Sequence, residues 1–244
     1  NILDKTDSVT VHKLTDVHIQ ADKSGIWSNA NNIRRGQFPI KKPQVQIVSG
    51  ELKDMFYMFR DSPAALQNIA IKMYLRSIKT DGVDNVVLMT PRKQNCANSS
   101  NELNKILQDK VLNLTSKCDF SKLPFLNFGT MKFRLGAKVI QRKNNYEKGV
   151  FNGEIGYITR IYKDPKSNID CFTVEYKMED IVKIVDYTRN ELNQIELAYA
   201  LTVHVLQGSE YKTIIIIIDK SHYTMLDSCL LYTASVIRVK WIFF

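Results

Sequence analysis

Apolar residues recur along the first half of the chain at the spacing of helices, with short apolar runs between them. The stretch Ser62–Ile78 is typical of a helix, because it opens on a serine and a proline and then carries apolar residues every three or four positions. Asn101–Val111 and Ser24–Gly36 show the same spacing. The apolar run Val86–Met89 is short, as expected for a buried strand. This alternation predicts a three-layer α/β domain.

The pattern changes at about Phe133, where short apolar segments separated by turn residues begin. These segments are Lys138–Gln141, Gly153–Tyr162, Cys171–Tyr176 and Ile181–Val185. Asn152-Gly153 and Asp164-Pro165 mark turns between them. Short strands joined by turns predict a small antiparallel β unit. The α/β pattern then resumes and closes with a strand at Val239–Phe244.

The composition is that of an ordinary globular chain, with 44% hydrophobic and 24% charged residues. The formal net charge of +9 favours a polyanionic partner, although charge alone changes that expectation only slightly. The four cysteines are scattered without a CxxC pair, and with four histidines the sequence offers no metal-ligand cluster. Scattered cysteines are expected to be reduced thiols, as in the cytoplasm. The sequence shows no signal peptide and no apolar run of membrane-spanning length, so we expect a cytoplasmic protein with no membrane partner.

The polar segment Ala198–Glu210 (AYALTVHVLQGSE) precedes the apolar run Thr213–Asp219 (TIIIIID), which predicts a strand buried on both faces. Hydroxyl, imidazole, amide and carboxylate groups follow one another closely in this segment, at a place where α/β proteins often bind phosphates. The same residue types are explained equally well if Gln207-Gly208 is a plain turn and His204 is a surface histidine whose hydrogen bonds are already made. The residues alone leave both interpretations open.

The segment Ala198–Glu210 closely resembles motif V of the superfamily 1 DNA helicases, in the RecD-like and TraA-like branch. Other stretches resemble further motifs of the same family in the same order. They are Val11–Gly36 (motif IV), Val86–Gln108 (with MTPRKQ and ELNKILQ), Phe133–Gly156 (FRLGAKVIQRKNNYEKGVFNGEIG) and Leu230–Lys240 (LLYTASVIRVK, motif VI). The resemblance therefore extends over nearly the whole chain.

This resemblance implies a RecA-like three-layer domain with a parallel sheet, interrupted by a small antiparallel β-barrel. The RecA-like part would comprise residues 1–132 and 191–244, and the barrel insertion residues 133–190. The sequence contains no GxxxxGK[ST] phosphate loop and no DE-type Mg²⁺-binding motif. We therefore expect the C-terminal half of a helicase core that hydrolyses no ATP alone. ATP and Mg²⁺ would be bound mainly by an absent N-terminal RecA-like domain.

The family moves along single-stranded DNA through phosphate contacts and base stacking. The resemblance assigns DNA contacts to Thr90, Thr202 and His204, whose hydroxyl and imidazole groups can hydrogen-bond phosphate oxygens. For Thr90, a structural turn or cap is the alternative. Tyr146 and Phe151 could offer stacking surfaces, but packing in a core or turn is the favoured interpretation.

The same resemblance assigns nucleotide binding to Gln207, Gly208 and Glu210, near the domain interface. Motif VI normally supplies an arginine finger that reaches the γ-phosphate, and Arg238 is the candidate catalytic residue. Three residues (SVI) separate Arg238 from the preceding Thr-Ala pair where the family has two. One extra residue rotates a helical side chain by about 100°, which puts the placement of this arginine in doubt.

Two further positions depart from the family pattern. Ile19 stands where the family has an arginine near the γ-phosphate, and Val205 stands where motif V has a lysine. Isoleucine cannot make the charge-assisted contact that arginine makes with a phosphate. These departures favour a second hypothesis, a degenerate non-catalytic helicase half that binds nucleic acid or a protein partner.

The leading hypothesis is the C-terminal motor domain of an ATP-dependent DNA helicase of 5′→3′ polarity. Its expected partners are single-stranded DNA, the N-terminal RecA-like domain and other recombination or repair subunits. RNA is a weaker alternative substrate. It stays open because related motors act on both nucleic acids and no residue in the sequence is identified as reading the 2′-hydroxyl group that distinguishes RNA from DNA.

Overall fold

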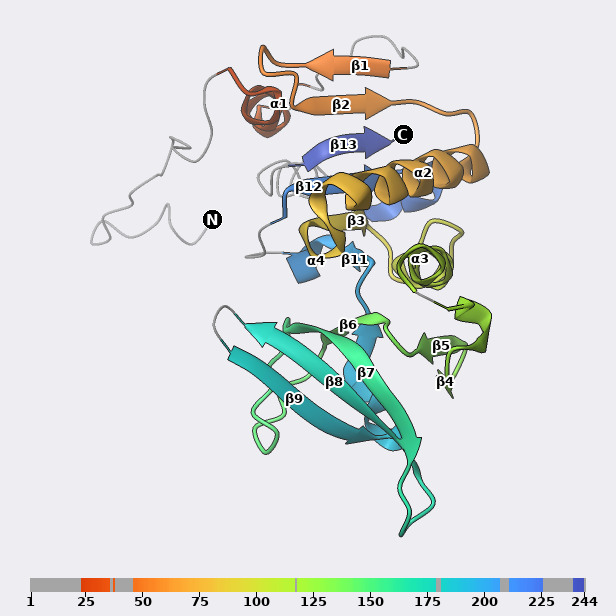
Figure 1. The fold of residues 1–244 in the computed structure, drawn as a ribbon. Helices are drawn as coiled ribbons and strands as arrows, with labels where there is room; N and C mark the ends of the chain where they lie inside the picture. Colours follow the sequence, from red (N-terminus) through yellow and green to blue (C-terminus); the bar gives the residue numbers. More distant parts are fainter. Residues whose placement is uncertain are drawn as a thin grey trace, which may run out of the picture.

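Two apolar strands that are buried on both faces form the centre of the larger sheet. β3 (Val86–Thr90) and β12 (Thr213–Ile217) lie side by side and parallel, and all of their residues are buried. The sheet also contains β1 (Gln46–Ser49), β2 (Met55–Met58), β11 (Ala200–Thr202) and β13 (Val239–Phe243). The order is β1-β2-β13-β12-β3-β11, with β1 antiparallel to β2 and the other neighbours parallel (Figure 1). The computed structural model describes residues 23–35, 37, 46–116, 118–178, 181–206, 211–225 and 239–243.

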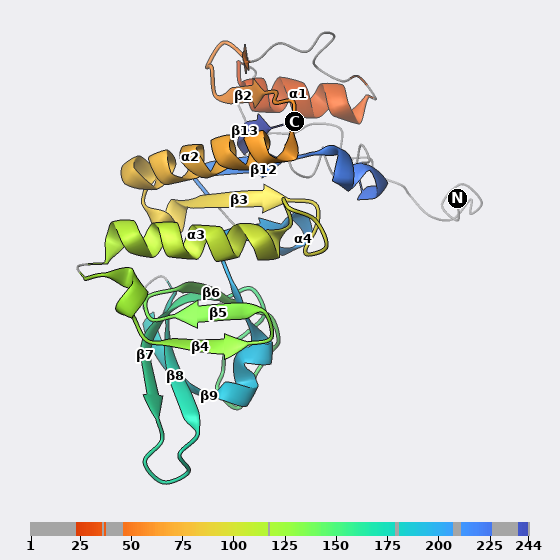
Figure 2. The same ribbon diagram turned by 90° about the vertical axis from the view of Figure 1, so that its right-hand side faces the viewer.

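Two long helices, α2 (Pro63–Asp81) and α3 (Ser100–Thr115), pack against this sheet (Figure 2). Ser62 caps α2 by accepting a hydrogen bond from the backbone N of Ala65 (3.2 Å), and Gly82 ends the helix with a φ of 84°. The shorter helices are α1 (Gly25–Arg34) and α4 (Val203–Leu206). The 3-10 turns are η2 (Val83–Asn85), η3 (Phe120–Lys122), η4 (Arg189–Gln194) and η5 (Lys220–Met225).

Alternate residues of the central strands point to opposite faces of the larger sheet, and each face has its own apolar cluster. Val86 and Leu88 belong to a cluster with residues of α2 and α3, whereas Val87 and Met89 belong to a second cluster with Ile26 of α1. This arrangement confirms the strand that the sequence predicts to be buried on both faces before Asp219. It also confirms the predicted alternation of helices with a mainly parallel sheet.

The smaller sheet is antiparallel throughout. It contains β6 (Lys138–Gln141), β7 (Ile155–Lys163), β8 (Asp170–Met178), β9 (Ile181–Thr188) and β10 (Ile195–Leu197). Its order is β10-β6-β7-β8-β9, and a separate hairpin of β4 (Phe125–Phe128) and β5 (Met131–Arg134) packs against α3. These strands confirm the antiparallel unit predicted from the turn-rich sequence.

Two details of this unit differ from, or go beyond, the sequence prediction. Asn152-Gly153 forms the predicted turn, in which the backbone N of Glu154 donates to the carbonyl oxygen of Phe151 (3.2 Å), but this turn is only the last part of the longer connection of residues 142–154 between β6 and β7. The sheet runs from Lys138 to Leu197, and its edge strands are β9 and β10. Closure into a barrel, and domain boundaries at residues 133 and 190, stay predictions.

The two sheets are joined by the short linker between β10 and β11. Asn104 of α3 is buried beside this linker and makes four hydrogen bonds to its backbone. Its Nδ2 donates to the carbonyl oxygens of Leu197 (3.0 Å) and Ala200 (2.8 Å), and its Oδ1 accepts from the backbone N of Tyr199 (3.0 Å) and of Ala200 (2.8 Å). One amide side chain therefore fixes the point where the chain passes from one sheet to the other.

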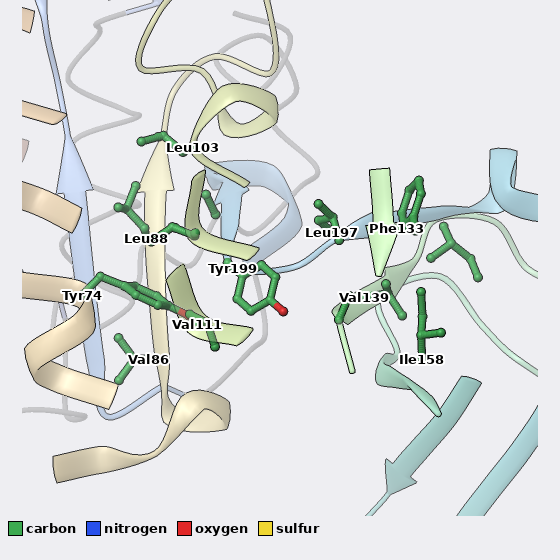
Figure 3. Packing of buried hydrophobic residues seen from close by; sticks show 14 of the residues in the cluster. Tyr74, Val86, Leu88, Leu103, Val111, Phe133, Val139, Ile158, Leu197 and Tyr199 are labelled. Carbon is green, nitrogen blue, oxygen red and sulfur yellow. The ribbon is translucent and has the colours of Figure 1, made fainter. Parts of the chain in front are cut away.

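The apolar core is continuous through this joint. Figure 3 shows Tyr199 between residues of the larger sheet and its helices on one side and residues of the smaller unit on the other. The first group includes Tyr74 and Leu88, and the second includes Val139 and Leu197. The two sheets thus share one cluster of buried side chains, which favours a fixed relative orientation.

A lysine is buried inside the same joint. Lys138 donates from Nζ to the carbonyl oxygen of Val83 (2.9 Å) and lies over the ring of Tyr211. Burial lowers the pKa of Lys138 to about 8, although the nearby carboxylate of Asp84 acts in the opposite direction. Asp84 also accepts a hydrogen bond from the Tyr157 hydroxyl of β7, so polar contacts as well as apolar ones connect the two sheets.

Replacement of Asn104 should loosen this joint. Asn104→Ala leaves buried backbone groups of the linker without partners, and we expect it to lower the free energy of unfolding by about 2 to 4 kcal/mol. Urea unfolding followed by circular dichroism would measure the loss. Asn113→Ala, at an exposed position of the same helix, should change stability by less than about 0.5 kcal/mol. Equal stabilities of the two variants would contradict the assigned role of Asn104.

Candidate nucleic-acid interface

The candidate site lies where the parallel strands of the larger sheet end. Thr202, the last residue of β11, stands opposite Thr90, the last residue of β3, in the parallel register. β12 pairs with β3 on its other side and ends at Ile217. Parallel strands have their carboxyl ends at one edge, and open α/β sheets bind ligands at that edge. The structure thus brings two of the three predicted DNA-binding residues side by side.

Thr90 has a structural partner at this edge. Its side chain is fully buried, and Oγ1 donates a hydrogen bond of 2.6 Å to the carbonyl oxygen of Asn98. This bond fixes the loop that leads from β3 to α3, in the manner of the structural cap that the sequence offered as an alternative. A contact between Thr90 and DNA stays a prediction. To donate a hydrogen bond to a phosphate oxygen, the Thr90 hydroxyl would have to give up its hydrogen bond to Asn98.

Thr202 and His204 are more accessible than Thr90. Thr202 is half-buried, and His204 is exposed on α4, the single helical turn that follows β11. Val205, which stands where the family has a lysine, is half-buried and packs against the second apolar cluster of the larger sheet. At this turn the protein therefore offers a hydroxyl and an imidazole, while the neighbouring valine contributes to the core.

A buried polar network connects the loop after β3 with the turn after β12. Asn98 donates from Nδ2 to a carboxylate oxygen of Asp219 (2.6 Å). The other carboxylate oxygen of Asp219 accepts from the backbone N of Ser221 (2.8 Å), whose carbonyl oxygen accepts from Arg92 (3.1 Å). The Nδ1 atom of His222 accepts from the backbone N of Asp219 (3.1 Å). These bonds hold two loops of the edge in one arrangement.

The network also sets the protonation of its members. Burial alone would raise the pKa of Asp219, but hydrogen bonds from Ser221 and Asn98 outweigh it and hold the pKa below its usual range. For His222, burial dominates and lowers the pKa, although the carboxylate of Asp219 acts in the opposite direction. At neutral pH the edge therefore contains an ionised carboxylate and a neutral imidazole.

This network is not among the site residues that the sequence predicts. Asp219 carried a usable signal, because a polar residue directly after an apolar strand often lies at the carboxyl edge of a sheet. Asn98 and His222 carried none, since their meeting depends on contacts between residues far apart in the chain.

Cationic residues extend from this edge towards the smaller sheet. Lys93, in the loop after β3, forms an ion pair with Glu196 of β10 (2.6 Å). Glu196 also lies 3.6 Å from the guanidinium of Arg142, at the start of the connection between β6 and β7. A continuous series of charged contacts therefore links the carboxyl edge of the larger sheet to the smaller one.

The predicted nucleotide-binding positions Gln207, Gly208 and Glu210, the candidate arginine finger Arg238 and the departure at Ile19 lie outside the described residues. Within the described residues, no group of three or more His, Cys, Asp and Glu side chains is arranged to hold a metal ion. In the same part of the chain, no helix has both the length and the apolar character that are needed to cross a membrane.

Two family models match this chain. The model for the ATP-dependent RecD-like DNA helicase SH3 domain matches residues 103–176, which extend from α3 through most of β8. The model for the UvrD-like helicase C-terminal domain matches residues 197–235, which include Thr202 and His204.

Individual helicases show the same similarity. The ATP-dependent RecD2 DNA helicase of Deinococcus radiodurans is 37% identical over 101 residues, which cover 41% of this chain and 13% of that protein. The RecBCD enzyme subunit RecD of Buchnera aphidicola is 28% identical over 133 residues, which cover 54% of this chain and 20% of that protein. The aligned regions thus span a fifth or less of these curated relatives. A crystal structure of a Pif1 helicase from Bacteroides, in complex with ADP-AlF3 and ssDNA, aligns with a TM-score of 0.45 and 15% identity over 90% of this chain and 49% of that one.

The two domain matches and the RecD relatives support a C-terminal region of the superfamily 1 helicase class. Within that class, the matched region is RecD-like. The family indicated by the sequence motifs is therefore confirmed.

His222 should make the stability of the carboxyl edge depend on pH. Its folded pKa lies below the value of about 6.5 in an unfolded chain, so the unfolded state binds the additional proton as the pH falls. The free energy of unfolding should therefore decrease below about pH 6.5. His222→Gln removes this proton uptake, and urea unfolding between about pH 7 and pH 5 should show a less steep decline than in the wild type.

The exposed His204 supplies the matched control for this measurement. His204→Gln should retain the wild-type pH dependence, because the residue is exposed on α4 and takes no part in the buried network. Identical slopes for the wild type and His222→Gln would show that the buried imidazole does not control the acid sensitivity.

Proposed function

We propose that this chain supplies the second motor domain of an ATP-dependent helicase that moves along single-stranded DNA. In this proposal it contributes strand contacts and the far side of an ATP cleft, whereas an N-terminal RecA-like domain binds most of the nucleotide. The observation that carries the proposal is the pairing of Thr202 with Thr90 at the carboxyl edge, followed directly by the exposed His204. Hydroxyl and imidazole groups at such an edge can bind phosphate oxygens without recognising bases.

In this proposal the nucleotide site is completed by another domain. The proposal starts from the sequence, in which no GxxxxGK[ST] phosphate loop occurs. Gln207, Gly208, Glu210 and Arg238 are the proposed contributions of this chain to ATP. The nucleotide would supply the energy for closing the two motor domains, and the strand-binding edge would move with this domain.

The finer parts of the proposal follow from the RecD-like family alone. They are a 5′→3′ direction of movement and an association with other recombination or repair subunits. Direction could be tested on forked substrates with a single 5′ or 3′ tail, once the N-terminal domain is supplied.

A second candidate function is that of a non-catalytic strand-binding or scaffold module. The observation that favours it is Val205, which packs against the apolar cluster at the position where the family has a cationic side chain. Supplying the N-terminal half distinguishes the two candidates. ATP hydrolysis stimulated by single strands would support the motor, and strand binding without hydrolysis would support the module.

The first test is binding of a fluorescent oligo-dT strand across a salt series, beside a duplex of the same length. We expect binding that prefers the single strand and weakens with salt, because phosphate contacts release counterions. The chain alone should hydrolyse no ATP. Equal binding to the duplex, or no binding at low salt, would contradict the proposed strand-binding edge.

His204→Ala tests the edge itself. Loss of one hydrogen bond to a charged phosphate should weaken oligo-dT binding by roughly tenfold, with stability unchanged because the side chain is exposed. Asn113 lies near the C-terminal end of α3, and Asn113→Ala should bind oligo-dT like the wild type. If His204→Ala binds as tightly as this control, the imidazole does not contact the strand.

A further inference from the structure

The connection between β6 and β7 displays two aromatic rings to solvent. Tyr146 is 76% exposed and Phe151 is 45% exposed, and their ring centroids lie 6.0 Å apart in an edge-to-face arrangement. These exposures exclude the core packing that the sequence favoured as one possibility, whereas the edge-to-face contact is the packing within a turn that it favoured as the other. The rings contact each other while leaving much of their surface open.

Asparagine side chains hold this connection, residues 142–154, in a fixed shape. Asn145 and Val150 exchange two backbone hydrogen bonds (2.8 and 3.0 Å), and Asn145 Oδ1 accepts from the backbone N of Lys148 (3.1 Å). Asn144 Oδ1 accepts from the backbone N of Asn152 (2.9 Å), beside Phe151. The rings are therefore presented on an ordered loop, so that little conformational entropy is lost when a ligand binds them.

The surroundings of the rings are polar and include a cation. Lys143 is exposed and forms no ion pair among the described residues, and Asn144 and Asn152 are exposed beside the rings. The same loop carries two carboxylates, the exposed Glu147 and the half-buried Glu154. Exposed rings among polar groups and a cation suit the bases and phosphates of a single strand. A protein-docking site would instead have an apolar centre.

This loop is continuous with the proposed strand-binding edge. Arg142 opens the loop and approaches Glu196, and Glu196 pairs with Lys93 in the loop that follows Thr90. A strand that passes Thr202 and His204 can therefore follow Lys93 and Arg142 towards the aromatic pair. The contacts of Glu196 with Lys93 and Arg142 thus connect the loop that carries the rings with the loop after Thr90.

We propose that Tyr146 and Phe151 form a stacking platform for bases of single-stranded DNA as the strand leaves the carboxyl edge of the larger sheet. This inference rests on the proposed function, because it assumes that the strand lies along that edge. Every base has an aromatic face, so the platform binds without sequence preference.

Binding of oligo-dT to Tyr146→Ala, Phe151→Ala and the double variant tests the platform in the full chain. Each single substitution should raise the Kd roughly five- to hundredfold through loss of base stacking. Tyr146→Trp retains an aromatic face and should bind at least as tightly as the wild type. Phe128→Ala removes a comparably exposed ring from β4, and it should leave the Kd unchanged.

An oligonucleotide with abasic sites replacing its bases provides an independent readout. The wild type should bind the abasic strand as weakly as the double variant binds oligo-dT, and the double variant should bind both strands equally. Circular dichroism would check that the variants remain folded, as expected for two exposed rings.

The outcomes separate the platform from the proposed function. If the wild type binds oligo-dT but Tyr146→Ala and Phe151→Ala bind equally well, the platform is overturned while the strand-binding edge stands. If His204→Ala weakens binding and the aromatic variants weaken it further, both are supported. If the wild type does not bind single strands at all, both proposals are overturned.

Discussion

The hydrogen bonds between Asn104 and the linker of β10 and β11 are the constraint on which the rest of the structure depends. The chain leaves the antiparallel sheet at Leu197 and enters the parallel sheet at Ala200, and both residues lie on edge strands, so that the backbone groups on the side facing Asn104 have no strand partner. Burying such groups without partners is costly, and a single amide supplies both donors and acceptors. Tyr199 then completes the joint by packing between the two halves of the core. Sheet orientation, the position of Thr202 and the proximity of Glu196 to Lys93 all follow from this arrangement.

The carboxyl edge shows how polar groups are divided between structure and ligand binding. Thr90, Asn98, Asp219 and His222 form hydrogen bonds with one another or with nearby backbone, and they are buried. They keep the loops in place, and their polar groups are used in these bonds except for Oδ1 of Asn98, which is buried without a partner. Thr202 and His204 lie on the accessible side, and Thr202 stands opposite Thr90 in the parallel register. A binding surface at this edge would need few groups of its own, because the buried network holds the adjoining loops in place.

The parts of the fold that the sequence predicts correctly are those governed by local pattern. Spacing of apolar residues, a serine followed by proline and an unbroken apolar run are sufficient for α2, β3 and β12, because each signal lies within the element that it describes. The buried network of Asn98, Asp219 and His222 could not be predicted in this way, since it joins residues that only the complete sheet brings together. For Tyr146 and Phe151 the sequence left core packing and packing within a turn open, because an aromatic residue in a short turn-rich segment has the same local pattern whether it is buried or exposed. The resemblance of ELNKILQ to the family was recognised, whereas the reason for its asparagine became clear only when Asn104 was seen beside the linker.

The shortness of the linker has a mechanical meaning. Ala198 and Tyr199 alone separate two hydrogen-bonded sheets, and both are held by hydrogen bonds, Ala198 to Lys138 and Tyr199 to Asn104. We therefore expect a force applied to the smaller sheet to reach Thr202 along the backbone. Thr202 is only three residues beyond Tyr199, and no unbonded segment lies between them. Under tension we therefore expect the two sheets to move together, because no unbonded segment lies between them along this path.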